Sequence, residues 1–227
     1  MHRAEWDLHY QRPSAIQYAY SIATVAGAQT PIVPEGAYAP PGDYQLTLSV
    51  DGKTERATLK VLQDPRTSVS DADFRSVLTL SQEIGASLAT ARRGYGEMTA
   101  AQGQLTTAAA ALKTARPAED LAARVAALAD RLKPPKTGPG FLAATAVLAG
   151  IETDLEAADR APTEPQRATA ARARAQIDAL WTAWTALRDG DLAQVNTALA
   201  AAGQKPVVIP SGDSLVVKPP AGGEELP

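Results

Sequence analysis

Two carboxylates near the start of the chain have the residue types and spacing that acid–base chemistry on a sugar needs. Glu5 and Asp7 flank Trp6, so on an extended strand both carboxylates lie on the same face. Glycoside hydrolysis requires two carboxylates roughly 5–9 Å apart across a sugar-binding cleft. The alternative is structural, with Asp7 accepting hydrogen bonds from backbone amides at a strand end beside Trp6. We favour the structural interpretation.

Metal, redox and nucleophilic chemistry have little support in the sequence. His2 and His9 are the only imidazoles, and their odd spacing places them on opposite faces of a strand. Two ligands are fewer than zinc normally takes. The chain has no cysteine, which excludes disulfides and thiol catalysis. Because acyl-transfer, phosphate-loop, dinucleotide-binding and zinc-protease motifs are also missing from the sequence, we assign no catalytic, cofactor or metal residue.

A pair of tryptophans is the remaining candidate for ligand contact. Trp181 and Trp184 are three residues apart and would form a stacking platform for a sugar ring if both were exposed. Trp184 falls on the apolar stripe of a predicted helix and is assigned to the core, whereas Trp181 is expected to cover the end of the helical region or a domain junction. The candidate interaction or ligand surface therefore consists of Trp6, Asp7 and Trp181.

The other charged clusters are interpreted as solvated surface, since charged pairs on a helix more often face water than a ligand. They are Asp154, Glu156, Asp159 and Arg160 on one helix, and the basic pairs Arg92–Arg93 and Arg172/Arg174. With a net charge of −3 and a pI near 5.5, the chain lacks the clustered positive charge that nucleic acid or anionic lipid requires. We therefore expect no nucleic-acid partner.

The composition is that of a globular protein with two kinds of domain. Hydrophobic residues make up 45% and charged residues 21% of the 227-residue chain. No apolar run reaches the roughly 18 residues that read as a membrane span. Residue use changes sharply near position 65, so we predict a β domain at 1–66, a helical domain at 67–203 and a proline-rich tail at 204–227.

The first domain is predicted to be a small antiparallel β structure. Residues 43–50 and 53–61 alternate apolar and polar side chains around Asp51-Gly52, a dipeptide that favours a type I′ turn. Residues 3–10 and 16–25 are predicted strands, with mostly loop at 26–42. Since an Ig-like sandwich needs about seven strands, the sandwich is incomplete. We expect the other strands before Met1, which makes the chain the C-terminal part of a longer protein.

From Ser70 onward the apolar period changes from two to about three and a half, which predicts helices packed as an up-and-down bundle. Ser70 with Asp73, and Thr163 with Gln166, resemble capping boxes at two helix starts. The predicted apolar stripes are Val77, Ser81, Ile84, Leu88, Ala91, Tyr95, Met98, Gln102, Leu105, Ala109 and Leu112; Leu121, Val125, Leu128 and Leu132; Ala144, Leu148, Ile151, Leu155 and Ala158; Ala173, Ile177, Leu180, Trp184 and Leu187; and Leu192, Val195, Leu199 and Ala202.

Glycines and the tail add further expectations. Gly94, Gly96 and Gly103 weaken the first helix and allow a bend there, whereas Gly203 is a natural end for the last helix. In the tail, residues 207–209 and 215–217 are apolar and are predicted to dock as short extended segments. The predicted fold class is therefore α+β, with a small Ig-like or fibronectin-like domain followed by the helical bundle.

Five short motifs occur in a characteristic order. They are Glu5-Trp6-Asp7-Leu8-His9-Tyr10; Pro41-Gly42-Asp43-Tyr44-Gln45-Leu46-Thr47-Leu48 with Asp51-Gly52-Lys53; Asp64-Pro65-Arg66; Ala161-Pro162-Thr163-Glu164-Pro165-Gln166; and Asp191-Leu192-Ala193-Gln194-Val195-Asn196. This order resembles the C-terminal region of bacterial sortilin-type, BNR-repeat β-propeller proteins, which are often labelled glycosyl hydrolases. This chain has His9 where that family usually has Arg, and its segment 13–39 is longer than the short loop that the family would lead us to expect.

The resemblance implies an Ig-like or fibronectin-like module and a helical region attached to an upstream propeller, in a parent protein exported to the periplasm or the cell exterior. The propeller and its sites are not in this chain, so no activity transfers to any residue here. We expect a non-catalytic accessory module that supports the propeller or binds another protein. One alternative is a stand-alone scaffold that self-associates through an exposed β edge or the bundle. The other is a carbohydrate-active module using Glu5, Asp7 or Trp181.

Overall fold

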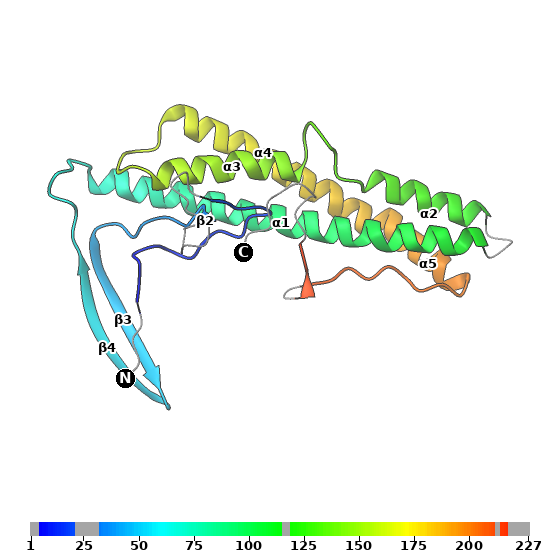
Figure 1. The fold of residues 1–227 in the computed structure, drawn as a ribbon, viewed down its shortest axis with the longest axis horizontal. Helices are drawn as coiled ribbons and strands as arrows, with labels where there is room; N and C mark the ends of the chain where they lie inside the picture. The colour runs from blue at the N-terminus through cyan, green and yellow to red at the C-terminus, as the bar shows by residue number, and fades with distance from the viewer. Residues whose placement is uncertain (1–4, 21–31, 115–118, 212–213, 218–227) are drawn as a thin grey trace. The chain divides into compact units, whose positions relative to one another are not determined.

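The computed structural model describes residues 5–20, 32–114, 119–211 and 214–217 as a mixed α/β protein (Figure 1). The elements, in chain order, are β1 (Ala19–Tyr20), β2 (Ile32–Val33), β3 (Gly42–Val50), β4 (Lys53–Val61), α1 (Asp71–Thr114), α2 (Glu119–Arg131), α3 (Phe141–Glu156), α4 (Glu164–Leu187), the π-helical turn η1 (Arg188–Leu192) and α5 (Ala193–Ala201).

The chain divides into two compact units that interleave along the sequence. Unit 1 contains Met1–Pro13, Tyr18–Ala86 and Leu148–Ala171, and unit 2 contains Ser14–Gln17, Ser87–Val147 and Arg172–Pro227. Helices α1, α3 and α4 therefore each contribute residues to both units. The domain boundaries predicted from composition stay a prediction.

The predicted hairpin in unit 1 is confirmed. Strands β3 and β4 pair antiparallel around Asp51 and Gly52, whose φ angles of 49° and 78° are both positive, as a type I′ turn requires. The register places Leu46 opposite Ala57, so the apolar faces of the two strands coincide. Among the described residues, β3 and β4 pair only with each other, and β1 with β2 forms a separate two-stranded sheet. The predicted sandwich is therefore not confirmed.

The strand predicted at residues 3–10 is wrong over its described part, residues 5–10. Only one bridge, between His9 and Tyr38, joins this segment to another strand-like segment. Leu8 has a φ of 65°, which breaks the extended conformation, and the Asp7 carboxylate binds the backbone N–H of His9. Such local side-chain bonds compete with a β ladder. Of the second predicted strand, 16–25, only β1 is formed among the described residues, and 21–25 lie outside them.

The predicted helical stripes coincide closely with the buried residues. In unit 2, α2 runs beside the C-terminal part of α1 (Figure 1), and these helices share a core with α4, η1 and α5. The core consists of Ala101, Leu105, Ala109, Leu112, Ala122, Val125, Leu128, Ala129, Leu132, Trp184, Leu192, Val195, Leu199 and Val207. In unit 1, the largest buried helical side chains are Leu80, Ile84, Leu148, Ile151 and Leu155.

The helix ends follow the predicted capping chemistry in most places. Ser70 Oγ accepts from the Asp73 backbone N–H at 3.2 Å, and Gln166 Oε1 accepts from the Thr163 backbone N–H at 2.9 Å. Gly203 has the positive φ of 69° expected beyond a helix end. The predictions for Ala158 and Ala202 are wrong, because α3 ends at Glu156 and α5 at Ala201, and both residues are exposed.

The fifth predicted helix is not separated from the fourth by a break. The π-helical turn η1 joins α4 to α5, and the residues that flank it, Leu187 and Ala193, both keep right-handed helical φ and ψ angles. The chain therefore remains helical from Glu164 to Ala201. Turns of this kind arise by insertion of one residue into a helix and shift the faces that follow.

The first tail segment docks as predicted. Val207 is buried, and its backbone N–H and carbonyl both bond to the Asn196 side chain, at 2.8 and 3.0 Å. The next residue, Val208, makes the same paired contact with the Gln104 side chain, at 2.9 and 2.7 Å. Two amide side chains thus replace the missing β partner of this extended segment.

Two glycines of α1 are explained by close packing rather than by a bend. A Cβ atom at Gly94 would lie 2.5 Å from Cζ of the buried Phe141 ring. A Cβ atom at Gly96 would lie 2.7 Å from Cγ2 of Val217. Gly103 has no such neighbour within 4 Å. The first two glycines therefore admit side chains from other segments, and α1 continues through all three positions.

We expect the same substitution, glycine to alanine, to have opposite effects on stability at Gly103 and at Gly94. Gly103→Ala should stabilise the protein by roughly 0.5–1 kcal/mol, because alanine favours the helix at an open position. Gly94→Ala should destabilise it by about 1–3 kcal/mol, because the new methyl overpacks against Phe141. Urea unfolding of both variants measures the difference. Combining Gly94→Ala with Phe141→Leu should recover part of the loss, and equal stability of the two alanine variants would contradict the packing argument.

Candidate functional site

Trp6 and Asp7 lie on the described N-terminal segment of unit 1. The Trp6 ring packs edge-on against Tyr44 of β3, with centroids 5.3 Å apart, and its Nε1–H donates to the His9 carbonyl at 2.9 Å. Trp6 remains 39% exposed. Because Tyr44 lies on the apolar face of the hairpin, Trp6 extends that face rather than standing apart from it.

Asp7 has the structural role that the sequence favoured. Its Oδ1 accepts from the His9 backbone N–H at 3.0 Å and lies 3.6 Å from His9 Nδ1. The backbone N–H, with the nearby imidazole, holds the pKa of Asp7 below its usual value. A glycosidase acid requires a raised pKa, so Asp7 is unsuited to donate a proton. His2 lies outside the described residues.

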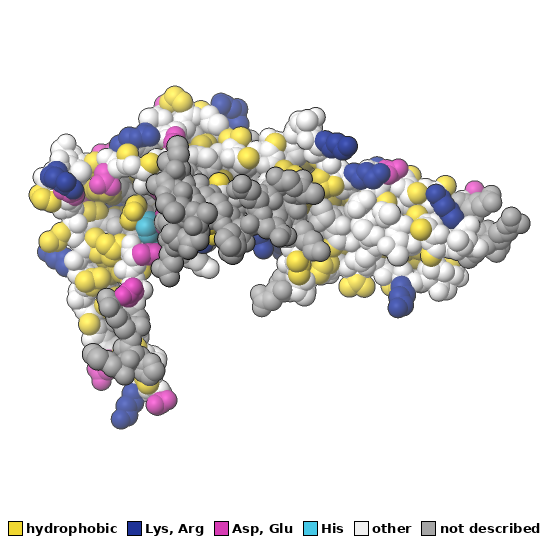
Figure 2. Space-filling model, in the orientation of Figure 1, with side chains coloured by type: hydrophobic (Ala, Val, Ile, Leu, Met, Phe, Trp, Pro, Cys, Tyr) yellow, Lys and Arg dark blue, Asp and Glu magenta, His cyan; other side chains and the backbone are white. Residues whose placement is uncertain are grey.

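The apolar face of the hairpin is open to solvent. Leu46 is 45%, Leu48 62% and Val50 55% exposed, and hydrophobic side chains are visible at the surface of the hairpin in Figure 2. A groove of about 610 Å³ runs over this face. Its lining includes Glu5, Trp6, Leu46, Leu48, Ala57 and Leu59. The hairpin surface, as we call this groove with Val50, is a concentration of exposed large apolar side chains.

Trp181 belongs to unit 2, so the three candidate surface residues do not come from one unit. The Arg93 guanidinium lies over the Trp181 ring, 5.0 Å from its centre, in a cation–π contact. Trp181 also packs against the unit 2 core, which leaves it half-buried. One face of the indole is thus occupied by Arg93. Trp184 is buried in the core, as predicted.

Glu97 is a buried carboxylate that the sequence analysis missed. Its side chain is 2% exposed and lies among three donors of unit 2. Trp184 Nε1 donates at 2.8 Å, Arg93 Nε at 2.7 Å, and Arg188 Nη1 lies 3.5 Å away. Arg93 remains exposed, as predicted, with 57% of its side-chain surface accessible, but it forms an ion pair with Glu97 and is not an isolated basic residue. The i, i+4 spacing of Arg93 and Glu97 is the sequence pattern from which this ion pair could have been predicted.

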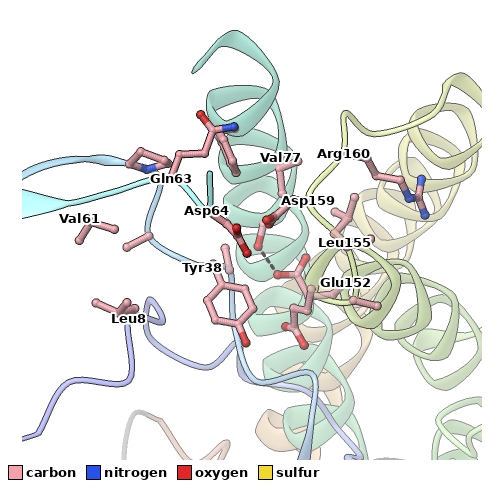
Figure 3. A pocket seen from close by; sticks show the side chains of 18 of the residues that line it. Leu8, Tyr38, Val61, Gln63, Asp64, Val77, Glu152, Leu155, Asp159 and Arg160 are labelled. Atoms are coloured by element: carbon pink, nitrogen blue, oxygen red, sulfur yellow. Dashed lines mark hydrogen bonds between the residues drawn. The ribbon is translucent and has the colours of Figure 1, made fainter. Parts of the chain in front are cut away.

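Unit 1 contains a cavity of about 410 Å³, shown in Figure 3. Its walls come from the N-terminal segment, the residues that flank β3 and β4, the first turns of α1, and the end of α3. The apolar lining includes Leu8, Val61, Leu62, Phe74, Val77 and Leu155. The polar lining includes Tyr38, Gln63, Asp64, Ser81, Glu152, Glu156, Asp159 and Arg160. We call this space the Glu152 cavity.

Glu152 is the most deeply buried acid of this cavity, with 1% of its surface exposed. The Ser81 hydroxyl donates to Glu152 Oε1, as the dashed line in Figure 3 marks, whereas Oε2 has no hydrogen-bond partner among the described residues. Burial raises the pKa of Glu152 to about 7; the Ser81 bond opposes this rise and the charge of Glu156 adds to it. The group therefore holds its proton close to neutral pH.

Glu156 was interpreted as part of a solvated helix face, and that interpretation is wrong. It is half-buried, and its two oxygens accept from the backbone N–H groups of Glu35 at 3.0 Å and Gly36 at 2.7 Å. Burial raises the pKa of Glu156 despite these two bonds, which lower it. No local pattern could reveal these bonds, because the partners are about 120 residues away in sequence. Asp154, Asp159 and Arg160 are exposed, as predicted.

Comparisons with known proteins give no further assignment. No family model matches the chain, and neither the curated proteins nor the solved structures contain a match. Across the described ranges, none of the helices combines the length and apolar character needed to cross a membrane. In the same residues, no three His, Cys, Asp or Glu side chains are grouped so that they could hold a metal ion.

The raised pKa of Glu152 predicts a pH-dependent stability. The folded protein keeps this proton up to about pH 7, whereas the unfolded chain loses it near 4.5. The contribution of Glu152 to stability is therefore fully present below pH 4.5 and is lost as the pH rises through 7. Since one pH unit corresponds to about 1.4 kcal/mol, the loss is on the order of 3 kcal/mol.

Urea unfolding of the wild type and Glu152→Gln across this pH range tests the prediction. The glutamine variant keeps the volume but cannot titrate, and Glu156 is present in both proteins. The wild type should lose stability relative to the variant as the pH rises. A difference in unfolding free energy that does not change with pH would contradict the assignment to Glu152.

Proposed function

We propose that this chain is a non-catalytic accessory module that packs its hairpin surface against another protein domain. The observation that carries the proposal is the exposure of Leu46, Leu48 and Val50 on one face of β3. Each large apolar side chain gains roughly 1.5–3 kcal/mol from full burial. A face that places three of them in water, with Trp6 beside them, is suited to association.

The family resemblance supplies the partner in this proposal. In sortilin-type BNR-repeat proteins, the equivalent β module adjoins a β-propeller, and we propose that propeller as the surface against which the hairpin packs. The proposal includes the finer fold predicted from sequence. The β portion would be an incomplete Ig-like sandwich whose open face is covered by the partner, and the helices would form an up-and-down bundle that braces it. Export of the parent protein is part of the same proposal.

A second copy of the chain is the alternative occupant of the hairpin surface. The same exposed side chains favour it, because a self-complementary apolar face would be buried in a symmetric dimer. The outer edges of β3 and β4, which pair with no other strand of the described residues, offer additional backbone hydrogen bonds to such a copy. The two occupants are distinguished by whether the isolated chain associates with itself or only with a propeller.

Charge substitution on the hairpin surface tests both occupants. Leu46→Glu with Leu48→Glu should weaken association at least about tenfold, because it places two charges in an apolar interface. The matched control is Gln45→Glu with Ser49→Glu, which adds the same charge on the opposite, polar face of β3. Affinity for a separately purified family propeller is measured by calorimetry, and self-association by light scattering. Equal affinity of the two double variants would overturn the proposed surface.

A further inference from the structure

The Glu152 cavity has the size and lining of a ligand site. Its volume of about 410 Å³ lies within the roughly 300–1,000 Å³ typical of small-molecule pockets. Apolar side chains from four segments form the walls, among them Leu8, Val61, Phe74 and Leu155. Ser81 of α1 and Glu152 and Glu156 of α3 bring polar groups to the wall that these two helices form, whereas Gln63 and Arg160 lie away from Glu152 in Figure 3. Such a site suits a small molecule with one polar end and an apolar body.

The unpartnered oxygen of Glu152 indicates what the polar end must be. Ser81 donates to Oε1, but Oε2 has no hydrogen-bond donor among the described residues. Glu152 is nevertheless almost fully buried, with 1% of its surface exposed. A buried acceptor without a donor is destabilising, so a ligand that brings an N–H to this atom gains the bond that the protein lacks. A carboxylate makes its strongest such bonds with charged donors.

The surrounding charges favour a cation over an anion. Glu156 and Asp159 line the cavity with Glu152, whereas Arg160 is the one base among the described residues that line it. Asp64 also lines it, but the Arg66 guanidinium binds both of its oxygens. Burial raises the pKa of the Tyr38 hydroxyl, and the carboxylates of Glu35, Glu156, Asp7 and Asp159 raise it further, which is consistent with a negative potential in this region.

We propose that the Glu152 cavity binds a small organic cation, a protonated primary amine on an apolar stem, with Glu152 as its anchor. The ammonium supplies donors for Oε2, and the stem lies against the apolar walls. Glu156 is bound to the backbone of Glu35 and Gly36, so it contributes charge without being free to anchor the ligand. This site is independent of the hairpin surface and of the propeller partner.

Calorimetry with the full chain tests the proposal, using phenethylammonium as the cation and 2-phenylethanol as its neutral match. The amine should bind at least about tenfold more tightly than the alcohol, because a charge-assisted bond is stronger than a neutral one. Glu152→Gln should remove this preference and leave the alcohol unaffected. Asp154→Asn is the matched control, since Asp154 is an exposed acid of α3 outside the lining, and it should bind the amine as the wild type does.

Proton release provides a second readout that does not depend on the variant folding. Near pH 7 the empty Glu152 is partly protonated, so binding of the ammonium should release a fraction of a proton, measured in two buffers of different ionisation enthalpy. Glu156, Asp64, Asp159, Tyr38 and Arg160 also face the cavity, and a folded Glu152→Gln keeps all of them while losing the release. Equal binding of amine and alcohol, the absence of proton release in the wild type, or no saturable amine binding up to about 10 mM would overturn the proposal.

Discussion

A carboxylate can enter a helical core only if donors replace the water that it loses, because an unpaired buried charge is strongly destabilising. Unit 2 meets this constraint at Glu97, with donors from α1, the end of α4 and the π-helical turn. Trp184 lies in the core and Arg188 is the first residue of that turn. The Glu97 carboxylate therefore links exposed Arg93 of α1 to the buried face of α4. The position of Trp181 beneath Arg93 follows from the same arrangement.

Unit 1 meets the constraint differently and less completely. Glu156 is satisfied by two backbone N–H groups, which fix the Glu35–Gly36 loop to the end of α3. Glu152 has one donor for two oxygens, and its pKa rises until the group keeps a proton near neutral pH. Both oxygens of Glu97 accept hydrogen bonds, which fits a structural role, whereas Glu152 Oε2 could still accept one. A partly satisfied acid with a raised pKa in a cavity is a candidate functional group.

The hairpin surface shows a second departure from complete burial. The β3–β4 register brings the apolar faces of both strands together, yet the large side chains of β3 stay about half exposed. A two-stranded hairpin is marginal by itself and normally needs a further layer. Among the described residues of unit 1, the Trp6 ring packs on Tyr44, and the exposure of Leu46, Leu48 and Val50 shows that it covers only part of the face. In the accessory role that we propose, a partner would supply the missing layer, which would explain both the apolar pattern of the face and its exposure.

The sequence by itself determined the local elements, because their causes are local. Asp51-Gly52 specified the turn, Ser70 and Thr163 specified helix starts, and the spacing of apolar residues specified which helix faces are buried. The strand predicted around Trp6 failed because the Asp7 side chain bonds its own neighbour's backbone and Leu8 adopts a positive φ, which the alternation of residues did not reveal.

Only the tertiary structure decided the candidate sites. It separated Trp181 from Trp6 and Asp7 into different units, and it changed Glu156 from a solvated acid into an anchor for a distant loop. It also buried Glu152, which no local pattern had marked, beside Ser81 of another helix. The physical reason is that burial and hydrogen-bond partners depend on segments far apart in the chain, whereas turns, caps and helical periodicity depend on residues a few positions apart.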